Sequence, residues 1–198
     1  MNLDLLDRLA GLALAFGRVE RATLHGDRVR QETDAEHTVM LGLVAVEVAG
    51  LYPLYFNPHL VAHFALVHDL VEAETPGGDT NSFDISPTAL AGKKACEEVG
   101  LWRLRERFAG TAMLAMIERY ESQLEPEARF VRYLDKVMPK LTHARNACAA
   151  IKAMGKTLAD LQRAHREQGA ALAAQYPELA ALVSPIFDDA CKAAEEAW

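Results

Sequence analysis

Apolar residues recur every three or four positions along most of the chain, the spacing that places them on one face of an α-helix. No alternation of apolar and polar residues extends over the length of a strand. The only β-like run, Leu51 to Phe56, contains Pro53 and is more typical of a loop. The pattern therefore predicts an all-α protein, whose first helix carries the stripe Leu5, Leu6, Leu9, Leu12 and Phe16.

Capping residues and prolines set the expected helix boundaries. Thr33 and Glu36 form a T-x-x-E capping box behind a polar, turn-prone stretch from Thr23 to Asp34. Asn57 and Pro58 are typical of an N-cap followed by a proline at the first helical position. We expect the helix after the capping box to be buried on most faces. Together with similar signals downstream, these residues predict helices at 35–49, 58–74, 86–108, 112–123, 126–154, 158–175 and from 177 onward.

The composition is that of one globular domain without a broad basic surface. Of the 198 residues, 51% are hydrophobic and 25% are charged, a balance typical of folded proteins. The 21 basic and 28 acidic residues give a formal net charge of −7. This charge argues against sequence-independent binding of nucleic acid, which needs a basic surface. It is compatible with a small anionic ligand, because one or two arginines in a pocket can override the total.

The sequence gives no sign of a membrane segment or of export. Its longest apolar run, Val39 to Val46, ends at Glu47 and is far shorter than the ~20 residues of a membrane span. Asp4 and Asp7 stand where a secretory signal would carry basic residues. Three widely spaced cysteines without a C-x-x-C pair are typical of reduced thiols. We therefore expect a cytoplasmic protein with no membrane partner.

Four positions stand out for their chemistry: His37, the adjacent pair His68 and Asp69, and Asp135. They fall on three predicted helices and lie within apolar stretches. Imidazoles and carboxylates together suit a divalent transition metal, and converging helices are a common way to assemble such a site. A carboxylate buried alone is costly, and a metal offsets that cost. The alternative is a helical bundle without a metal, in which hydrogen bonds satisfy these side chains.

Two acidic residues follow the His-Asp pair. Glu72 is four residues after His68, so in a continuous helix it shares the same face one turn along. That position suits a general acid or base beside a metal, the alternative being a solvated glutamate at a helix end. Asp79 closes a glycine-rich stretch, Thr75 to Asp79, that predicts a loop. There it could orient a substrate hydroxyl or water, or serve as an ordinary turn residue.

The remaining histidines and the lysine beside Asp135 have simpler interpretations. His59 and His63 are four residues apart but lack nearby carboxylates, so we interpret them as surface or packing residues. His143 and His165 are isolated in the sequence. Lys136 could face a phosphate, but a lysine in this position more often extends to solvent.

Three stretches that contain these residues resemble the successive motifs of HD-domain phosphohydrolases. They read RQETDAEHTVMLGLVAVEVA, HFALVHDLVEAETPGGDT and YESQLEPEARFVRYLDKVMPK, and the branch they resemble is that of the YfbR-like 5′-deoxynucleotidases. The resemblance covers roughly residues 1–155. It implies an all-helical HD fold in a single domain, residues 1–198, with the segment 156–198 packed on the core or on a partner subunit.

The resemblance also implies a metal centre. His37, His68, Asp69 and Asp135 match the metal ligands of the family. Two imidazoles and two carboxylates suit one divalent transition metal, namely Mn²⁺, Co²⁺, Fe²⁺, Ni²⁺ or Zn²⁺.

Further residues match the substrate-handling positions of the family. The resemblance places Glu72 at the catalytic water and Asp79 at the substrate. An arginine upstream of the first histidine holds the phosphate in these enzymes, and Arg21 is the better match for it, with Arg18 as the second choice. The chain departs from the family in lacking an aromatic residue close after this arginine and in having a slightly longer loop before Asp79. Both departures fall in the substrate pocket and leave the ligands intact.

The resemblance thus implies a metal-dependent phosphohydrolase that releases phosphate from nucleoside, and especially deoxynucleoside, 5′-monophosphates. An alternative is an enzyme of the same fold acting on another phosphate ester, such as a nucleoside triphosphate or an alarmone. A second alternative is a non-catalytic module that binds metal or nucleotide. The implied partners are a small phosphate ester and a second copy of the chain in a homodimer.

Overall fold

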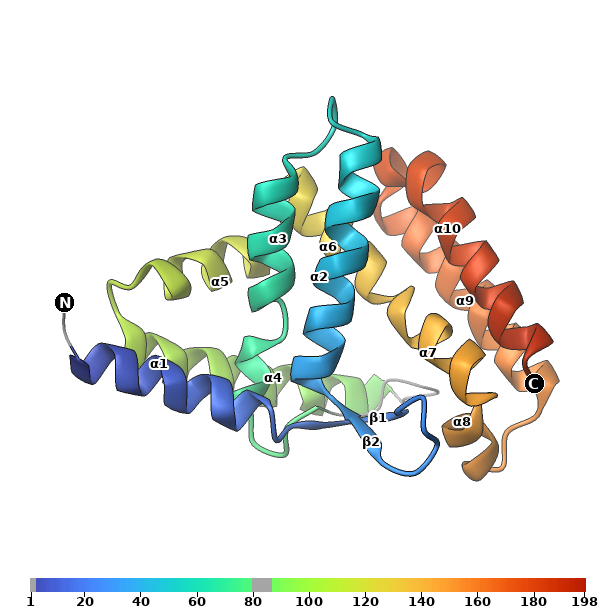
Figure 1. Cartoon of the computed structure of the whole chain (residues 1–198), viewed down its shortest axis with the longest axis horizontal. Coiled ribbons are helices and arrows are strands. Elements are labelled where there is room, and N and C mark those ends of the chain that lie inside the picture. Colours follow the sequence, from blue (N-terminus) through green and yellow to red (C-terminus); the bar gives the residue numbers. More distant parts are fainter. Residues whose placement is uncertain (1–2, 80–86) are drawn as a thin grey trace.

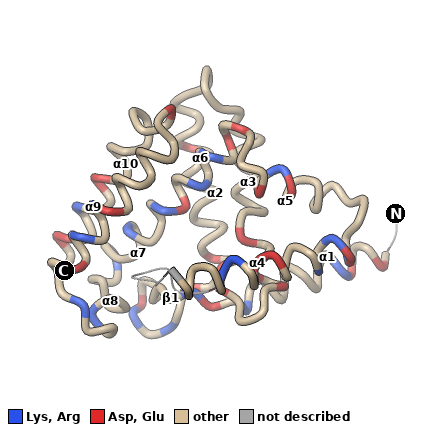
Figure 2. The backbone as a smooth tube through the Cα atoms, turned by 180° about the vertical axis from the view of Figure 1, so that it is seen from behind, with Lys and Arg blue, Asp and Glu red and all other residues tan. Residues whose placement is uncertain are grey.

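The computed structural model describes residues 3–79 and 87–198, and this part of the chain is mainly helical (Figure 1, and from behind in Figure 2). The predicted all-α class is confirmed. Ser86, the predicted start of one helix, lies outside the described residues. The elements are α1 (Leu3–Phe16), β1 (Glu20–Leu24), β2 (Gln31–Thr33), α2 (Asp34–Leu51), α3 (Pro58–Val67), the 3₁₀ helix η1 (Leu70–Glu74), α4 (Pro87–Phe108), α5 (Ala112–Ser122), α6 (Pro126–Asp135), α7 (Met138–Asn146), α8 (Ala149–Ala153), α9 (Leu158–Gln175) and α10 (Pro177–Glu196).

A two-stranded hairpin connects α1 to α2 and corrects the expectation of a turn without strands. β1 and β2 pair antiparallel, with Glu20 opposite Thr33, over part of the stretch predicted to be a polar turn. Strands of five and three residues are too short to show an alternating pattern. β2 leads directly into α2 through the predicted capping box. The backbone N–H of Glu36 donates to the Thr33 hydroxyl, and the Glu36 carboxylate accepts from the Thr33 N–H.

α2 is an outer element of the bundle, so the expectation that it is buried on most faces is wrong. Leu41 and Ala45 are fully buried, whereas Val39 and Leu43 are 63% and 72% exposed. The buried side packs along α3, which runs beside α2 in Figure 1. The turn after Leu51 agrees with the loop predicted there.

The helix predicted over residues 58–74 ends early. It begins as expected, because the Asn57 side chain caps α3 by accepting from two backbone N–H groups. It stops at Val67, and the chain continues as the 3₁₀ helix η1 from Leu70. Asp69 has φ −115° and ψ 9°, outside the α-helical range, which marks the break. The interruption falls at the His68-Asp69 pair.

A glycine lets α4 pack closely on η1. A Cβ at Gly100 would lie 2.8 Å from the carbonyl oxygen of Val71 and 2.5 Å from the hydroxyl of Thr75. Only glycine permits this approach of the two elements. The loop predicted after η1 is present, and Gly77 and Gly78 adopt positive φ angles of 91° and 65° within it.

The single helix predicted over residues 126–154 is divided into α6, α7 and α8. Pro139 lies in the first turn of α7 and cannot continue the backbone hydrogen bonds of a preceding helix. Ala147 and Cys148 both take left-handed conformations with φ 55°, and they separate α7 from α8. The apolar spacing continues across both breaks, which explains why the sequence pattern suggested one helix. The first break follows Asp135 directly.

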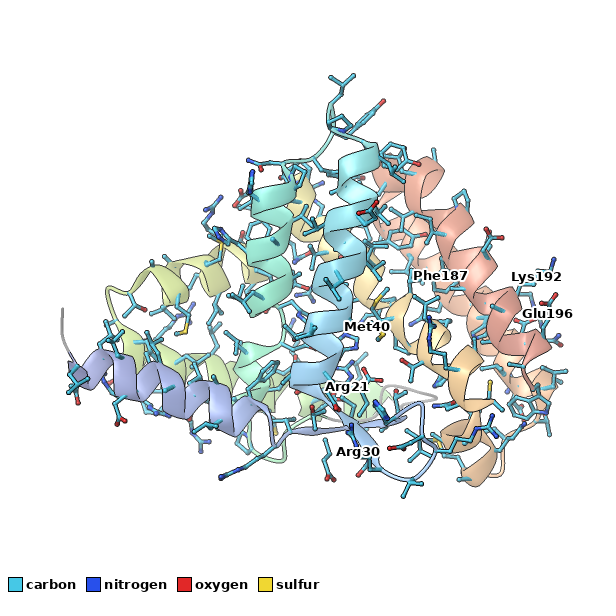
Figure 3. All side chains as sticks on the ribbon, viewed as in Figure 1. Arg21, Arg30, Met40, Phe187, Lys192 and Glu196 are labelled. Atoms are coloured by element: carbon cyan, nitrogen blue, oxygen red, sulfur yellow. The ribbon has the colours of Figure 1, made fainter. Side chains whose placement is uncertain are left out.

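The main core cluster takes residues from most of the helices, α10 included, and within it Phe56 stacks on Phe130 with ring centroids 4.2 Å apart. Of the last two helices, α10 packs on α6, α7 and α9 of the same chain, and Phe187 points from α10 toward α7 (Figure 3). All three cysteines are free thiols. No helix in the described residues combines the length and apolar character needed to cross a membrane.

Candidate metal centre

Breaks and ends of helices bring the four candidate ligands together. His37 lies in the first turn of α2, and His68 directly follows the last residue of α3. Asp69 is the N-cap of η1, and Asp135 is the last residue of α6. One ligand atom from each residue can be chosen so that all four lie within 4.8 Å of one another. Residues separated by up to 98 positions therefore form one cluster.

The two imidazoles and two carboxylates face a common point. His37 Nε2 lies 2.9 Å from Asp135 Oδ1, and His68 Nε2 lies 3.9 Å from the same oxygen. His68 Nε2 is also 3.0 Å from Asp69 Oδ2. Both histidines therefore direct Nε2 into the cluster.

The opposite ring nitrogens are held by other groups. His68 Nδ1–H donates to the carbonyl oxygen of Ala65 at 2.8 Å, and His37 Nδ1 lies 3.3 Å from Glu32 Oε1. This outer support is typical of metal-binding histidines, because it fixes the ring and leaves the other nitrogen for the ion. His68 Nε2 is buried, and within the described residues its contacts with Asp69 and Asp135 lack hydrogen-bond geometry. The donor set and this unsatisfied nitrogen fit a divalent transition metal.

The electrostatics of the cluster favour positive charge at its centre. Burial alone would lower the pKa of His37, but hydrogen bonds to Asp135 and Glu32 raise it to about 9. Burial disfavours ionised Asp135, yet the charge on Lys136 and the hydrogen bond from His37 hold its pKa well below the usual range. The pKa of Asp69 is lowered as well, since His68 outweighs the effect of burial. The carboxylates thus stay ionised and offer ligand oxygens to a cation.

Arg21 connects the cluster to the hairpin. From β1, its Nη1 donates to Asp69 Oδ2 at 2.9 Å and to Asp34 Oδ1 at 2.8 Å. Figure 3 shows it between the start of α2 and α7. Burial and the nearby Asp69 raise the pKa of Asp34 to about 6, although Arg21 acts in the opposite direction. Arg18, in contrast, is exposed before β1 and does not reach the cluster.

A second acidic group, composed of Asp34, Glu72 and Asp79, lies beside the first. Glu72 reaches it from η1, so the expected continuous helical face is not what positions this residue. Lys93 on α4 pairs with Asp79 at 3.0 Å and approaches Glu72 at 3.7 Å. Burial and the charges of Asp69 and Asp79 raise the pKa of Glu72 to about 10. The protein thus holds a proton at the Glu72 carboxyl near neutral pH.

The cluster opens into a cavity of about 520 Å³. Volumes of several hundred cubic ångströms are typical of sites for small molecules. Lys136 lines the cavity and donates to Asp135 Oδ2 at 2.7 Å, although its side chain is 41% exposed. We call the cluster side of the lining the metal end; its residues are Arg21, Asp69, Glu72, Asp79 and Asp135.

Several polar residues at the site carry no motif by which the sequence could reveal them. Glu32 and Lys93 are ordinary charged residues of a strand and a helix, and only the fold brings them to the metal end. His143 and His165, isolated in the sequence, are both buried and line the same cavity. For these two histidines the sequence offers no signal beyond the residue type itself. His59 and His63 are exposed on α3, in agreement with the interpretation as surface residues.

Comparisons with known proteins agree with this geometry. A family model described as HD domain matches residues 17–179. In a solved structure, a predicted metal-dependent phosphohydrolase from Magnetospirillum magnetotacticum MS-1 superposes with a TM-score of 0.66 and 24% identity, covering 96% of this chain and 94% of that one. That likeness shows the same fold. No curated protein matches the chain. Because the family model spans most of its length, the chain belongs to the HD domain family.

Proposed function

We propose that the chain is a metal-dependent phosphohydrolase of the 5′-deoxynucleotidase branch, which releases phosphate from nucleoside and especially deoxynucleoside 5′-monophosphates. The observation that carries this proposal is the ligand cluster at the end of a cavity that also presents Arg21 and Glu72. The solved relative from Magnetospirillum is itself described as a predicted metal-dependent phosphohydrolase, which supports the reaction class. The motif resemblance supports the substrate.

His37, His68, Asp69 and Asp135 would hold one divalent ion, with Mn²⁺, Co²⁺, Fe²⁺, Ni²⁺ and Zn²⁺ all compatible with the donors. When bound, such an ion supplies Lewis acidity and offsets negative charge on a phosphoryl group. The residues of the chain provide the remaining steps.

Arg21 is the cation that would receive the phosphate. It lines the cavity and already bridges two carboxylates, so its guanidinium is fixed before substrate arrives. A guanidinium in fixed position pairs well with phosphate oxygens. Lys136, also in the lining, adds a second positive charge on the side of Asp135.

Glu72 and Asp79 would manage protons and orientation. Glu72 faces the cavity beside Asp69 and holds a proton, so it can donate to the leaving 5′-oxygen, or accept a proton from water after ionising. Asp79 lies on the same wall and is held by Lys93, in a position to orient a sugar hydroxyl or a water. Lys93 thereby stabilises both carboxyl groups.

Phosphate release from a panel of nucleoside and deoxynucleoside 5′-monophosphates tests the proposal. The protein is stripped of metal and reloaded with Mn²⁺ or Co²⁺, with Asp69→Ala as the blank and the exposed Asp7→Ala as the matched control. We expect release by the wild type and by Asp7→Ala, and none by Asp69→Ala. If metal is bound but no nucleotide of the panel releases phosphate, the nucleotidase proposal is contradicted. The chain would then act on another phosphate ester or serve as a non-catalytic binding module. Absence of bound metal contradicts the metal centre itself.

A further inference from the structure

The cavity extends from the metal end to a second polar region between α7 and α9. Lys140 and His143 line it from α7, and His165 lines it from α9. In Figure 1, α9 and the α2–α3 pair lie on opposite sides of α7. We call this region the far end. Five apolar residues contribute to its wall, namely Pro139, Ile151, Met154, Leu161 and Ala164, and Asp160, Arg163, Glu167 and Gln168 line it as well.

Two buried imidazole nitrogens at the far end lack hydrogen bonds within the described residues. They are Nδ1 of His143 and Nε2 of His165, in side chains that are only 7% and 5% exposed. His165 uses its other nitrogen, because Nδ1–H donates to Glu195 Oε1 at 2.7 Å. A buried polar atom without a partner costs free energy, and a ligand that supplies the partner recovers it. The far end is therefore built to accept hydrogen-bonding groups.

The charges around these nitrogens disfavour a second anionic group. Burial, together with the neighbouring Lys140 and His165, lowers the pKa of His143 to about 4. Burial also lowers the pKa of His165, so both imidazoles are neutral near pH 7. With its Nδ1–H given to Glu195, neutral His165 offers an acceptor at Nε2, which repels phosphate oxygens.

The cationic side chains of the far end already have partners within the protein. Lys140 donates to the Gln168 side chain and lies over the Phe187 ring at 5.0 Å. Arg163 pairs with Asp160 at 2.7 Å, and Glu167 adds an exposed carboxylate to the lining. A dianionic group here would find the ammonium of Lys140 and the guanidinium of Arg163 already engaged. It would also lie near the carboxylates of Asp160 and Glu167. An uncharged group with its own donors and acceptors fits better.

We propose that the far end is the subsite for the uncharged, planar heterocycle of the substrate, a nucleobase. His143 and His165 hydrogen-bond to its edge, and the apolar wall packs against its faces. This inference rests on the proposed function, which places the phosphate at the metal end. His143 lies five residues beyond Met138 at the start of α7, a helical rise on the order of 8 Å within that helix alone.

The kinetic test compares a nucleoside 5′-monophosphate with deoxyribose 5-phosphate, which lacks the base. In the wild type, kcat/KM is expected to favour the nucleotide. His143→Leu should lower the ratio of the two kcat/KM values about tenfold, the effect of one lost hydrogen bond to a ligand. His59→Leu changes an exposed histidine of α3 and should leave the ratio unchanged. A ratio near one in the wild type, or one unaffected by His143→Leu, overturns the subsite while phosphate release still supports the proposed function.

A binding measurement on the wild-type protein decides the subsite without catalysis or a variant. Deoxyadenosine and thymidine are titrated while the ¹⁵N resonances of the imidazoles are recorded. We expect shifts of the His143 and His165 nitrogens and none of those of His59 and His63. If neither nucleoside moves the two far-end histidines, the proposal is overturned, even where phosphate release is observed. If inorganic phosphate moves them and the nucleosides do not, the far end is an anion site and the proposal is equally wrong.

Discussion

At the metal end of the cavity, Arg21 and the ligand carboxylates are held by opposite charges, whereas at the far end the buried imidazoles stay neutral. Arg21, Asp69 and Asp135 belong to a continuous network in which hydrogen bonds and ion pairs keep each group ionised. His143 and His165 each keep one nitrogen without a partner, and burial lowers the pKa of both. The two ends of the cavity therefore suit different chemical groups. The metal end suits a cation and a phosphate, and the far end suits an uncharged group.

The largest expected effect comes from removing a charge at the centre of the network. Asp135→Asn keeps the shape of the side chain but removes the negative charge that faces both histidines. We expect metal affinity to fall by more than the 10- to 100-fold typical of losing an outer partner, and phosphate release to fall to the level of stripped protein. Metal content by mass spectrometry and phosphate release measure the two effects. The exposed Asp189→Asn on α10 is the matched control. Full metal content in Asp135→Asn would contradict the ligand assignment.

The next test separates proton transfer from metal binding at the same end. Glu72→Gln removes the ionisable carboxyl but keeps its size and part of its hydrogen bonding. Because a positioned acid or base contributes about 10²–10⁴ in rate, kcat should fall by that factor while metal content stays unchanged. Glu74→Gln, two residues further along η1 and paired with Arg107 outside the cavity lining, serves as the control. Undiminished turnover of metal-loaded Glu72→Gln would remove this residue from the mechanism.

The two ends also differ in how far the sequence reveals them. At the metal end, His37, the His68-Asp69 pair and Asp135 could be singled out because histidine and carboxylate within apolar helices are chemically unusual, and the surrounding motifs are ordered along the chain. The structure brings all four into one cluster. At the far end, Lys140 and His143 resemble ordinary polar residues of a helix. Because α10 packs on both α7 and α9, the fold brings His165 near them, and no local pattern records that arrangement.

The same limit explains the errors in the fold. The apolar spacing was sufficient to predict the helices, and the caps at Thr33 and Asn57 were predicted correctly. The breaks after Val67 and Asp135 were not, because apolar spacing continues through them. Both breaks lie at ligand residues, and the break after Asp135 also has a local cause in Pro139. The hairpin was missed because β2 has only three residues and is held by its contact with β1.

A milder change tests whether the outer support of His37 matters. Glu32→Gln removes the carboxylate 3.3 Å from His37 Nδ1 but leaves all four ligands in place. Outer partners of this kind contribute about 10- to 100-fold to metal affinity, so the dissociation constant should rise by that factor. Glu20→Gln, an exposed glutamate on the neighbouring strand, controls for the loss of one charge near the hairpin. Competition with a chelator of known affinity measures the constant, and an unchanged value would show that Glu32 plays no part in holding the ion.

The smallest expected effect tests the neutral state of the far end through stability. The pKa of His143 is about 4 in the folded protein against 6.5 for an unperturbed histidine, so between these values the unfolded chain binds more protons. Stability contributed by the neutral imidazole is therefore present above pH 6.5 and is lost as the pH falls toward 4. Lys140 and His165 face the ring and act in the same direction. Between pH 7 and pH 5 the wild type should lose about 2 kcal/mol of folding stability from this group. The His143→Gln variant should not show this loss. The His59→Gln variant should show the same loss as the wild type. Urea denaturation at the two pH values measures the difference. Equal pH dependence in the wild type and His143→Gln would mean that the imidazole is charged or solvated, and the contrast between the two ends would then disappear.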